Sequence, residues 1–354
     1  MTHVFIAPHP DDVALSCGGL IASLRELGQT VTILTVYSGS GGEIPGREAL
    51  GFGTKAVWPV TEAFNRSHLI ADYPEDSSAA PWQASKEGLD ATQSDADAAA
   101  KRFWQRSSWY RRANIHNESL AGQAVIDDLA TQGAVLTTER LDAAEAGDLL
   151  AARRLEDERY AAFAEVSIVW LDLPDAVYRG YEGDDQLLGD PRPDDAAPVD
   201  ILRREIARLE PQRVYLPLAV GGHVDHRLVR DAGTALIHDA RRWVMPGPEY
   251  VGRIAYYEDF PYAWWDDFTR IEELPGGIIP GLPEGVSVSP EFADVSDQIE
   301  RKIRGIAIYE SQVGRLFNDP KAMAKAVRSH AMRIADLGRV PNGAAERYWV
   351  TTLA

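Results

Sequence analysis

Cysteine is almost absent from this sequence, which contains one cysteine, Cys17, in 354 residues. A single cysteine cannot form an intrachain disulfide, and it cannot supply the several thiolates of a cysteine-rich zinc site. The sequence therefore fits a reducing compartment best, and we expect a cytoplasmic protein. Cys17 lies on the apolar face of a predicted helix, where a buried core residue is expected rather than a nucleophile.

Basic residues are fewer than acidic ones. The sequence contains 36 Lys and Arg and 54 Asp and Glu, which gives a net charge of -18. This charge repels polyanions, so we expect no nucleic-acid partner. No apolar run reaches the length of a membrane-spanning helix, and we expect no transmembrane segment. The N-terminal residues have neither the basic start nor the long apolar stretch of a signal peptide.

What the sequence does contain is apolar patterning, with 45% hydrophobic residues. The length fits one large α/β domain or two domains. Residues 4–7 form a short apolar run, residues 17–27 repeat apolar side chains at helical spacing, and residues 31–37 form a β-branched run. Strand, helix and strand in this order predict a βαβ unit with a right-handed crossover.

The same alternation returns after a long irregular stretch. It predicts an α/β fold with a Rossmann-like, open, mainly parallel sheet and helices on both faces. We interpret residues 1–354 as a single domain, in which residues 38–138 are an insertion after the second strand with helices of its own. Residues 264–290 are expected to form a surface loop, and a final helical part from residue 294 is expected to wrap the sheet and end with residues 346–349. The remaining predicted helices are 139–165, 199–209 and 226–241, and the remaining predicted strands are 167–171, 213–216 and 250–257.

Two short motifs of histidine and aspartate each follow a predicted strand. They are His9-Pro10-Asp11-Asp12 and His223-Val224-Asp225-His226. Ligands of open α/β sheets bind at the carboxyl ends of the strands, so we expect both motifs at one edge of the sheet. Hydrolytic zinc sites use three ligands from His, Asp or Glu, which here can be His9, Asp12 and His226. Alone, the first motif would be weak evidence, since Pro and Asp are ordinary turn residues.

The other polar residues of the motifs suggest a reaction. Asp11 and Asp12 are neighbours and cannot point the same way, so we expect Asp12 to bind the metal and Asp11 to act as general base. His223, held by Asp225 and partly protonated, is expected to stabilise an oxyanion and to donate a proton to a departing amine. Zinc would lower the pKa of a water molecule and polarise a carbonyl, so the pattern predicts amide hydrolysis.

These motifs, together with Ala7-Pro8 and Cys17-Gly18-Gly19, resemble the signature of the PIG-L/LmbE family of zinc-dependent N-acetylglucosaminyl deacetylases. The resemblance implies zinc binding by His9, Asp12 and His226. It also implies a general base at Asp11 and an acid or oxyanion partner at His223. The implied substrate is an acetamido sugar or glycoconjugate, which would release acetate and a free amine. The second motif departs from the family by carrying valine where proline is commoner, and the insertion is long.

Weaker matches extend the resemblance. Arg153-Arg154-Leu155-Glu156 resembles an arginine-containing helix of the family, and Leu173-Pro174-Asp175 resembles the end of one of its strands. The family contacts its sugar at these positions, which makes Arg153 and Asp175 candidate substrate residues. Arg153 and Glu156 also have the helical spacing of a solvated ion pair.

Several alternatives stay open at this point. The metal can be zinc, iron(II) or another divalent ion. The chain can be a metal-dependent amidase or esterase acting on a non-sugar metabolite, or a non-catalytic sugar-binding relative. A complete set of base, acid and three ligands favours an enzyme. The partner expected is a small molecule, and the sequence allows a homo-oligomer.

Overall fold

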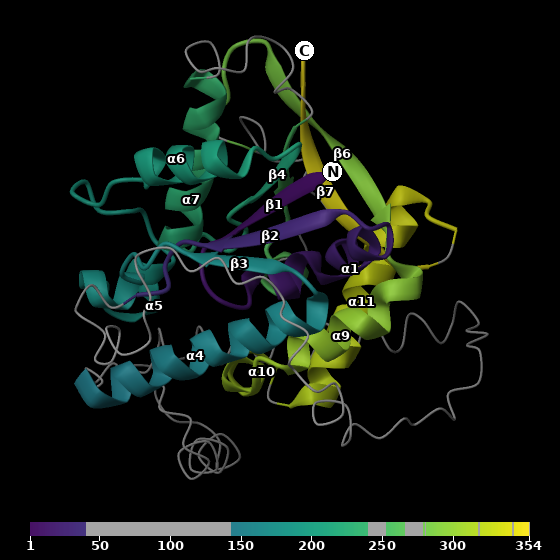
Figure 1. Cartoon of the computed structure of the whole chain (residues 1–354), viewed down its shortest axis with the longest axis horizontal. Helices are drawn as coiled ribbons and strands as arrows, with labels where there is room; N and C mark the ends of the chain where they lie inside the picture. The colour runs from purple at the N-terminus through teal and green to yellow at the C-terminus, as the bar shows by residue number, and fades with distance from the viewer. Residues whose placement is uncertain are drawn as a thin grey trace, which may run out of the picture.

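The computed structural model describes residues 1–39, 143–239, 253–265, 279, 281–317, 319–341 and 343–353. These residues form one seven-stranded sheet with the order β3-β2-β1-β4-β5-β7-β6 (Figure 1). The first five strands pair in parallel, and β7 is antiparallel to both of its neighbours. The predicted Rossmann-like, mainly parallel sheet is therefore confirmed. The strands are β1 (Thr2–Ala7), β2 (Thr30–Thr35), β3 (Ser167–Trp170), β4 (Arg213–Pro217), β5 (Ile254–Tyr257), β6 (Val286–Asp294) and β7 (Ala345–Leu353).

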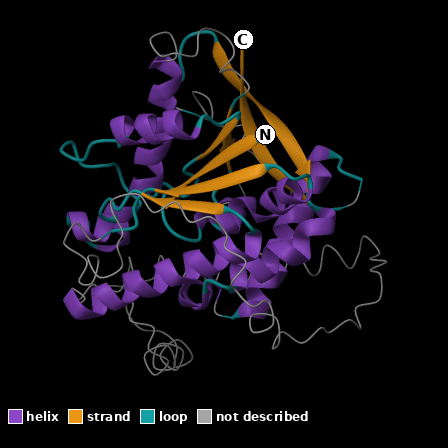
Figure 2. Ribbon diagram, viewed as in Figure 1, coloured by secondary structure: helices purple, strands orange, loops and turns teal. Residues whose placement is uncertain are grey.

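Helices cover both faces of this sheet, as the sequence predicted. α1 (Asp12–Glu26) and α4 (Ala143–Ala164) pack on one face, and α6 (Val199–Leu209) and α7 (Val224–Asp239) pack on the other (Figure 2). Side chains of a strand alternate between faces. Along β1, Phe5 and Ala7 accordingly join the core under α1, whereas Val4 and Ile6 join the core under α6 and α7.

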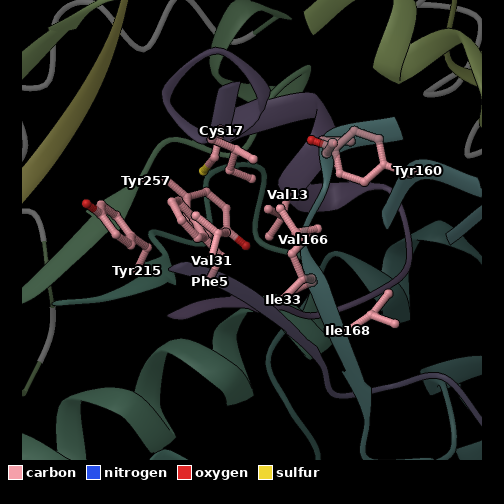
Figure 3. Close-up of a cluster of buried hydrophobic side chains, with 14 of the residues drawn as sticks. Phe5, Val13, Cys17, Val31, Ile33, Tyr160, Val166, Ile168, Tyr215 and Tyr257 are labelled. Atoms are coloured by element: carbon pink, nitrogen blue, oxygen red, sulfur yellow. The ribbon is translucent and has the colours of Figure 1, made fainter. Parts of the chain in front are cut away.

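The core under α1 is rich in aromatic side chains. Figure 3 shows Tyr215 and Tyr257 beside Cys17, on the same side of the sheet as Phe5. The Phe5 and Tyr215 rings stack with their centroids 4.1 Å apart. Burial raises the pKa of the Cys17 thiol well above its ordinary value, which keeps it protonated. The prediction that Cys17 is a core residue is confirmed.

The C-terminal part differs from the sequence prediction in two strands. The expected helices are present as η5 (Ser296–Gln298), α9 (Ile299–Ala307), α10 (Glu310–Phe317) and α11 (Pro320–Gly338). Residues 346–349 lie in β7, however, and β6 starts inside the predicted 264–290 loop. Glu346 and Arg347 are charged, so residues 346–349 do not show the apolar pattern of a buried strand in the sequence. Both side chains are nevertheless buried. Glu346 accepts a hydrogen bond from Lys302 at 2.7 Å, and Arg347 donates to Glu258 at 2.5 Å.

The predicted insertion, residues 38–138, lies outside the described residues except for Ser38 and Gly39. Its role and the single-domain organisation therefore stay predictions. Within the part of the chain that the structure describes, no helix has the length and apolarity needed to cross a membrane.

Candidate functional site

The two histidine motifs meet where the strand order reverses. β1 and β4 are adjacent and parallel, while β2 continues the sheet on one side and β5 on the other. Such a switch point is where open α/β sheets bind ligands. His9 follows β1, and His223 and His226 follow β4. Their imidazole rings lie close together, with centroids 5.0 Å apart for His9 and His223 and 5.3 Å apart for His9 and His226.

Local backbone geometry turns both motifs into the site. Asp11 has a φ of 88° and stands just before α1, a backbone state that non-glycine residues rarely adopt and that clusters at functional sites. The backbone N–H of His9 donates to Oδ2 of Asp12 at 2.7 Å, which closes the turn. Before the second motif, Gly221 has a φ of 83°, and a Cβ there would meet the ring of Tyr262 at 2.4 Å. α7 begins at Val224, two residues earlier than predicted.

Two histidine nitrogens converge on one carboxylate oxygen. Nδ1 of His9 and Nε2 of His226 each lie 3.3 Å from Oδ2 of Asp12. The second nitrogen of each ring donates to another carboxylate, with His9 Nε2 2.8 Å from Asp225 and His226 Nδ1 2.6 Å from Asp259. Because a carboxylate only accepts, these outer nitrogens carry protons. When the inner nitrogens are not protonated, they and Oδ2 of Asp12 offer lone pairs that could bind a cation.

The distances and charges also fit a metal ion. Ligand atoms at bonds of about 2.0–2.1 Å around tetrahedral zinc are separated by about 3.3 Å, which matches the distances of His9 Nδ1 and His226 Nε2 from Oδ2 of Asp12. Burial opposes the charged form of Asp12, but His226 and His9 outweigh it and lower its pKa to about 2. Burial likewise opposes protonation of His9, but Asp175, Asp12 and Asp225 outweigh it and raise its pKa well above the ordinary value. The same carboxylates would attract a divalent cation.

Two groups of three potential ligands are compact among the described residues, and both contain His9 but neither contains Asp12. Ligand atoms of His9, His223 and His226 lie within 4.8 Å of one another, and so do those of His9, Asp175 and Asp225. In the second group, Asp225 already accepts from His9, from the backbone N–H of residue 176 and from a guanidinium, which leaves it few lone pairs for a metal. His9 and His226 both lie beside Asp12, so these three residues and His223 are the candidate donors.

Asp11 contacts Arg153. Its Oδ1 lies 3.5 Å from Arg153, and the same guanidinium lies 3.6 Å from Asp175. Burial, followed by repulsion from Asp12, raises the pKa of the Asp11 carboxyl to about 7, although Arg153 acts against this. The structure thus brings Arg153 and Asp175 to the site. Glu156 does not pair with Arg153, because it accepts hydrogen bonds from the backbone N–H and the hydroxyl of Ser311 at 2.8 and 2.6 Å.

Asp225 contacts His223 through its backbone, while its carboxylate holds His9. Since α7 begins at Val224, the carboxylate of Asp225 lies in the first helical turn and accepts from His9 instead. The backbone N–H of Asp225 donates to Nδ1 of His223 at 3.3 Å, which leaves the ring proton on Nε2. Burial, and then His9 and His226, lower the pKa of His223 to about 3. His223 is therefore a neutral hydrogen-bond donor and not the partly protonated group that was expected.

The sequence did not identify two residues that contact the site. Asp259 holds His226, and Arg179, on η2 (Ala176–Arg179), contacts Asp225 at 2.6 Å. A signal for Asp259 was present, because it follows β5 just as His9 follows β1, and carboxyl ends of parallel strands carry ligands. Arg179 lies in a short loop helix and has no such signal.

Comparison with known proteins gives matches of three kinds. The family model described as PIG-L: GlcNAc-PI de-N-acetylase matches residues 4–57. The 2'-N-acetylparomamine deacetylase of Streptomyces fradiae is 31% identical over 335 residues, which cover 93% of this chain and 78% of that protein. Two solved structures share the fold. The zinc-inhibited form of teicoplanin deacetylase has a TM-score of 0.53 at 19% identity, covering 100% of this chain and 99% of that chain. The A40926 pseudoaglycone deacetylase has a TM-score of 0.52 at 20% identity, covering 99% and 97%.

Proposed function

Because this chain belongs to the PIG-L family of deacetylases, we propose that it hydrolyses the N-acetyl group of an N-acetylglucosamine-type sugar or glycoconjugate with the help of zinc. The family relationship makes the chain an enzyme that acts on amide bonds. The sugar is supported by the relative that is 31% identical, which is named for an acetylated aminoglycoside fragment.

The observation that carries the metal assignment is the convergence of His9 and His226 on one oxygen of Asp12. We assign these three residues as the ligands, with Asp225 and Asp259 orienting the two rings. Ligating histidines commonly donate their second ring nitrogen to a carboxylate in this way. Iron(II) can use the same donors, because imidazole and carboxylate suit both metals. When bound, the metal would lower the pKa of a water molecule and polarise the acetamide carbonyl.

The remaining polar residues have separate tasks. Asp11 is the general base that removes a proton from the attacking water and then passes it to the departing amine. It is not one of the assigned ligands, its contact with Arg153 is long, at 3.5 Å, and its raised pKa suits it to take up a proton. The Nε2–H of neutral His223 donates to the oxygen on which negative charge develops. A neutral imidazole can donate in this way without giving up its proton.

Arg153 and Asp175 are the residues we assign to the sugar. The guanidinium of Arg153 makes only long contacts, of 3.4 to 3.6 Å, with Pro10, Asp11 and Asp175, and its buried Nε has no hydrogen-bond partner among the described residues. A substrate hydroxyl or carbonyl can therefore bind there. Asp175 lies at the opposite side of the same guanidinium and can accept from a sugar hydroxyl.

An assay of acetate release tests the proposal. Metal-stripped and zinc-restored protein would be incubated with a panel of N-acetylglucosaminides, including N-acetylparomamine, and with N-acetylated non-sugar amines and acetate esters. We expect release from glucosaminides only after metal is restored. Release from the non-sugar compounds alone would favour the amidase or esterase alternative, and sugar binding without release would favour the non-catalytic relative.

Two variants test the assigned roles. Asp11→Asn should keep zinc but lose turnover by at least roughly 10²-fold, the usual contribution of general base catalysis. His226→Ala should lose the metal. Asp297→Asn removes an exposed carboxylate in η5 and serves as the control that changes neither property. An Asp11→Asn enzyme with normal turnover would refute the assignment of the base. A cytoplasmic location and a homo-oligomer stay predictions.

A further inference from the structure

The carboxylate of Asp225 is fully buried and is held by three donors, one in the segment after β1 and two in η2. Oδ2 accepts from His9 at 2.8 Å and from the backbone N–H of Ala176 at 3.0 Å. Oδ1 accepts from Nη2 of Arg179 at 2.6 Å. A carboxylate with one oxygen fixed by a guanidinium has little freedom to rotate, because a charge-assisted bond of this length is strong.

Arg179 is itself fixed on every side. Its Nε lies 3.0 Å from Asp195, its Nη1 donates to the carbonyl of Pro174 at 2.7 Å, and its guanidinium carbon lies 4.6 Å from the centre of the Tyr37 ring. Asp195 also accepts from the hydroxyl of Tyr181 at 2.9 Å. Each nitrogen of the guanidinium is therefore used within the protein, in contrast to the loosely held Arg153, so Arg179 is not available to a substrate.

We propose that Arg179 is a positioning residue for the metal site, acting through Asp225 on His9. The inference rests on the metal site proposed above. By fixing Oδ1 of Asp225, Arg179 directs Oδ2 to Nε2 of His9 and so keeps the proton of that ring on the outer nitrogen. Nδ1 then presents its lone pair beside Asp12. Outer partners of this kind orient ligands and raise metal affinity.

A zinc titration tests this role without relying on turnover. Metal-stripped wild-type protein and the Arg179→Gln and Arg179→Lys variants would be titrated with zinc against a chelating indicator. Arg179→Gln should bind zinc roughly 10–100-fold more weakly, the usual effect of losing an outer partner. Arg179→Lys should be intermediate, because an ammonium keeps the charge but cannot hold Asp225 and Asp195 together.

Arg192→Gln is the matched control. Arg192 lies between α5 (Gly183–Leu187) and α6 and contacts Tyr181 and the carbonyls of Gly180 and Arg179, but no contact joins it to Asp225 in the described structure. Its variant should bind zinc within about twofold of wild type, as expected for substitutions away from the site.

A double-mutant cycle separates positioning from a general loss of structure. If Arg179 acts through Asp225, Arg179→Gln should change zinc affinity by less than about threefold in an Asp225→Asn background. The effects of substitutions at two residues in contact do not add, because the second substitution removes an interaction that is already lost. Equal losses in both backgrounds would overturn the inference. So would wild-type zinc affinity in Arg179→Gln, and that outcome would leave the proposed function intact. Failure of the wild-type protein to bind zinc would overturn both.

Discussion

Nδ1 of His226 lies 2.6 Å from Oδ1 of Asp259, on the side of the ring opposite the nitrogen that faces Asp12. The other oxygen of Asp259 accepts the backbone N–H of Val220 at 2.8 Å. One buried carboxylate thus joins the segment after β5 to the segment after β4. These two contacts fix both the rotation and the tautomer of His226.

Asp259→Asn should therefore weaken metal binding. The asparagine side chain has one oxygen, which accepts, and one NH₂ group, which only donates. Either the ring N–H of His226 or the backbone N–H of Val220 would therefore face the NH₂ group and lose its acceptor. We expect the zinc dissociation constant to rise roughly 10–100-fold, as for other outer partners of ligating histidines. Chelator competition measures this constant, and the exposed Asp297→Asn variant provides the control. Unchanged affinity in Asp259→Asn would mean that the contact with His226 does not support the metal.

Removing zinc should lower thermal stability. A ligand that binds only the folded state stabilises it by about 2.7 kcal/mol at a free concentration 100 times its dissociation constant. Thermal unfolding with and without a chelator should therefore give a lower Tm for the stripped protein, reversed by added zinc. The His226→Ala variant should show no zinc-dependent change of Tm. A zinc response that persists in this variant would place the ion elsewhere.

The sequence was sufficient for those parts of the fold and site in which the pattern is local. Short apolar runs gave the parallel strands, and the rule that ligands lie at strand ends placed His9 and His226 together. The predicted bounds of α6, residues 199–209, agree with the structure. These successes depend on contacts between residues that are close in sequence or on the regular geometry of parallel strands.

Long-range pairing explains what the sequence could not predict. Glu346 and Arg347 resemble surface residues, because nothing nearby in the chain shows that Lys302 and Glu258 will neutralise them. Gly19 is a similar case, since a Cβ there would lie 2.9 Å from Oε1 of Glu346 and 2.8 Å from Val295. The glycine therefore allows the close approach of β7 to α1, a requirement invisible without the partner strand.

Breaking the buried pair of Lys302 and Glu346 should destabilise the fold strongly. Glu346 accepts from the backbone N–H groups of Gly19 and Leu20 at 2.9 Å and from Lys302 at 2.7 Å. Lys302 also donates to the carbonyl of Ser16 at 3.3 Å. Glu346→Gln would leave the ammonium buried without its charge partner, and we expect unfolding to become easier by about 3–5 kcal/mol.

Denaturant unfolding measures this effect. Combining Glu346→Gln with Lys302→Met should restore part of the loss, because the uncompensated charge is then gone. Glu300→Gln is the control, since Glu300 and Arg328 form an exposed pair at 2.7 Å that should contribute at most about 1 kcal/mol. A double variant less stable than the sum of both single losses would contradict this account.

Close packing of α7 on β4 should make Gly233 intolerant of a side chain. A Cβ at Gly233 would lie 2.3 Å from Cδ1 and 2.9 Å from Cγ of Leu216, which is fully buried. Gly233→Ala should therefore lower the free energy of unfolding by about 1–2 kcal/mol, because overpacking outweighs the gain in helix propensity. In a Leu216→Ala background, Gly233→Ala should be neutral or stabilising, because the space is then open.

Gly314→Ala in α10 is the control. A Cβ at Gly314 meets nothing within 4 Å, so this substitution should instead stabilise the fold by up to about 1 kcal/mol. Equal effects at both glycines in denaturant unfolding would show that helix propensity alone decides, and that the contact with Leu216 does not.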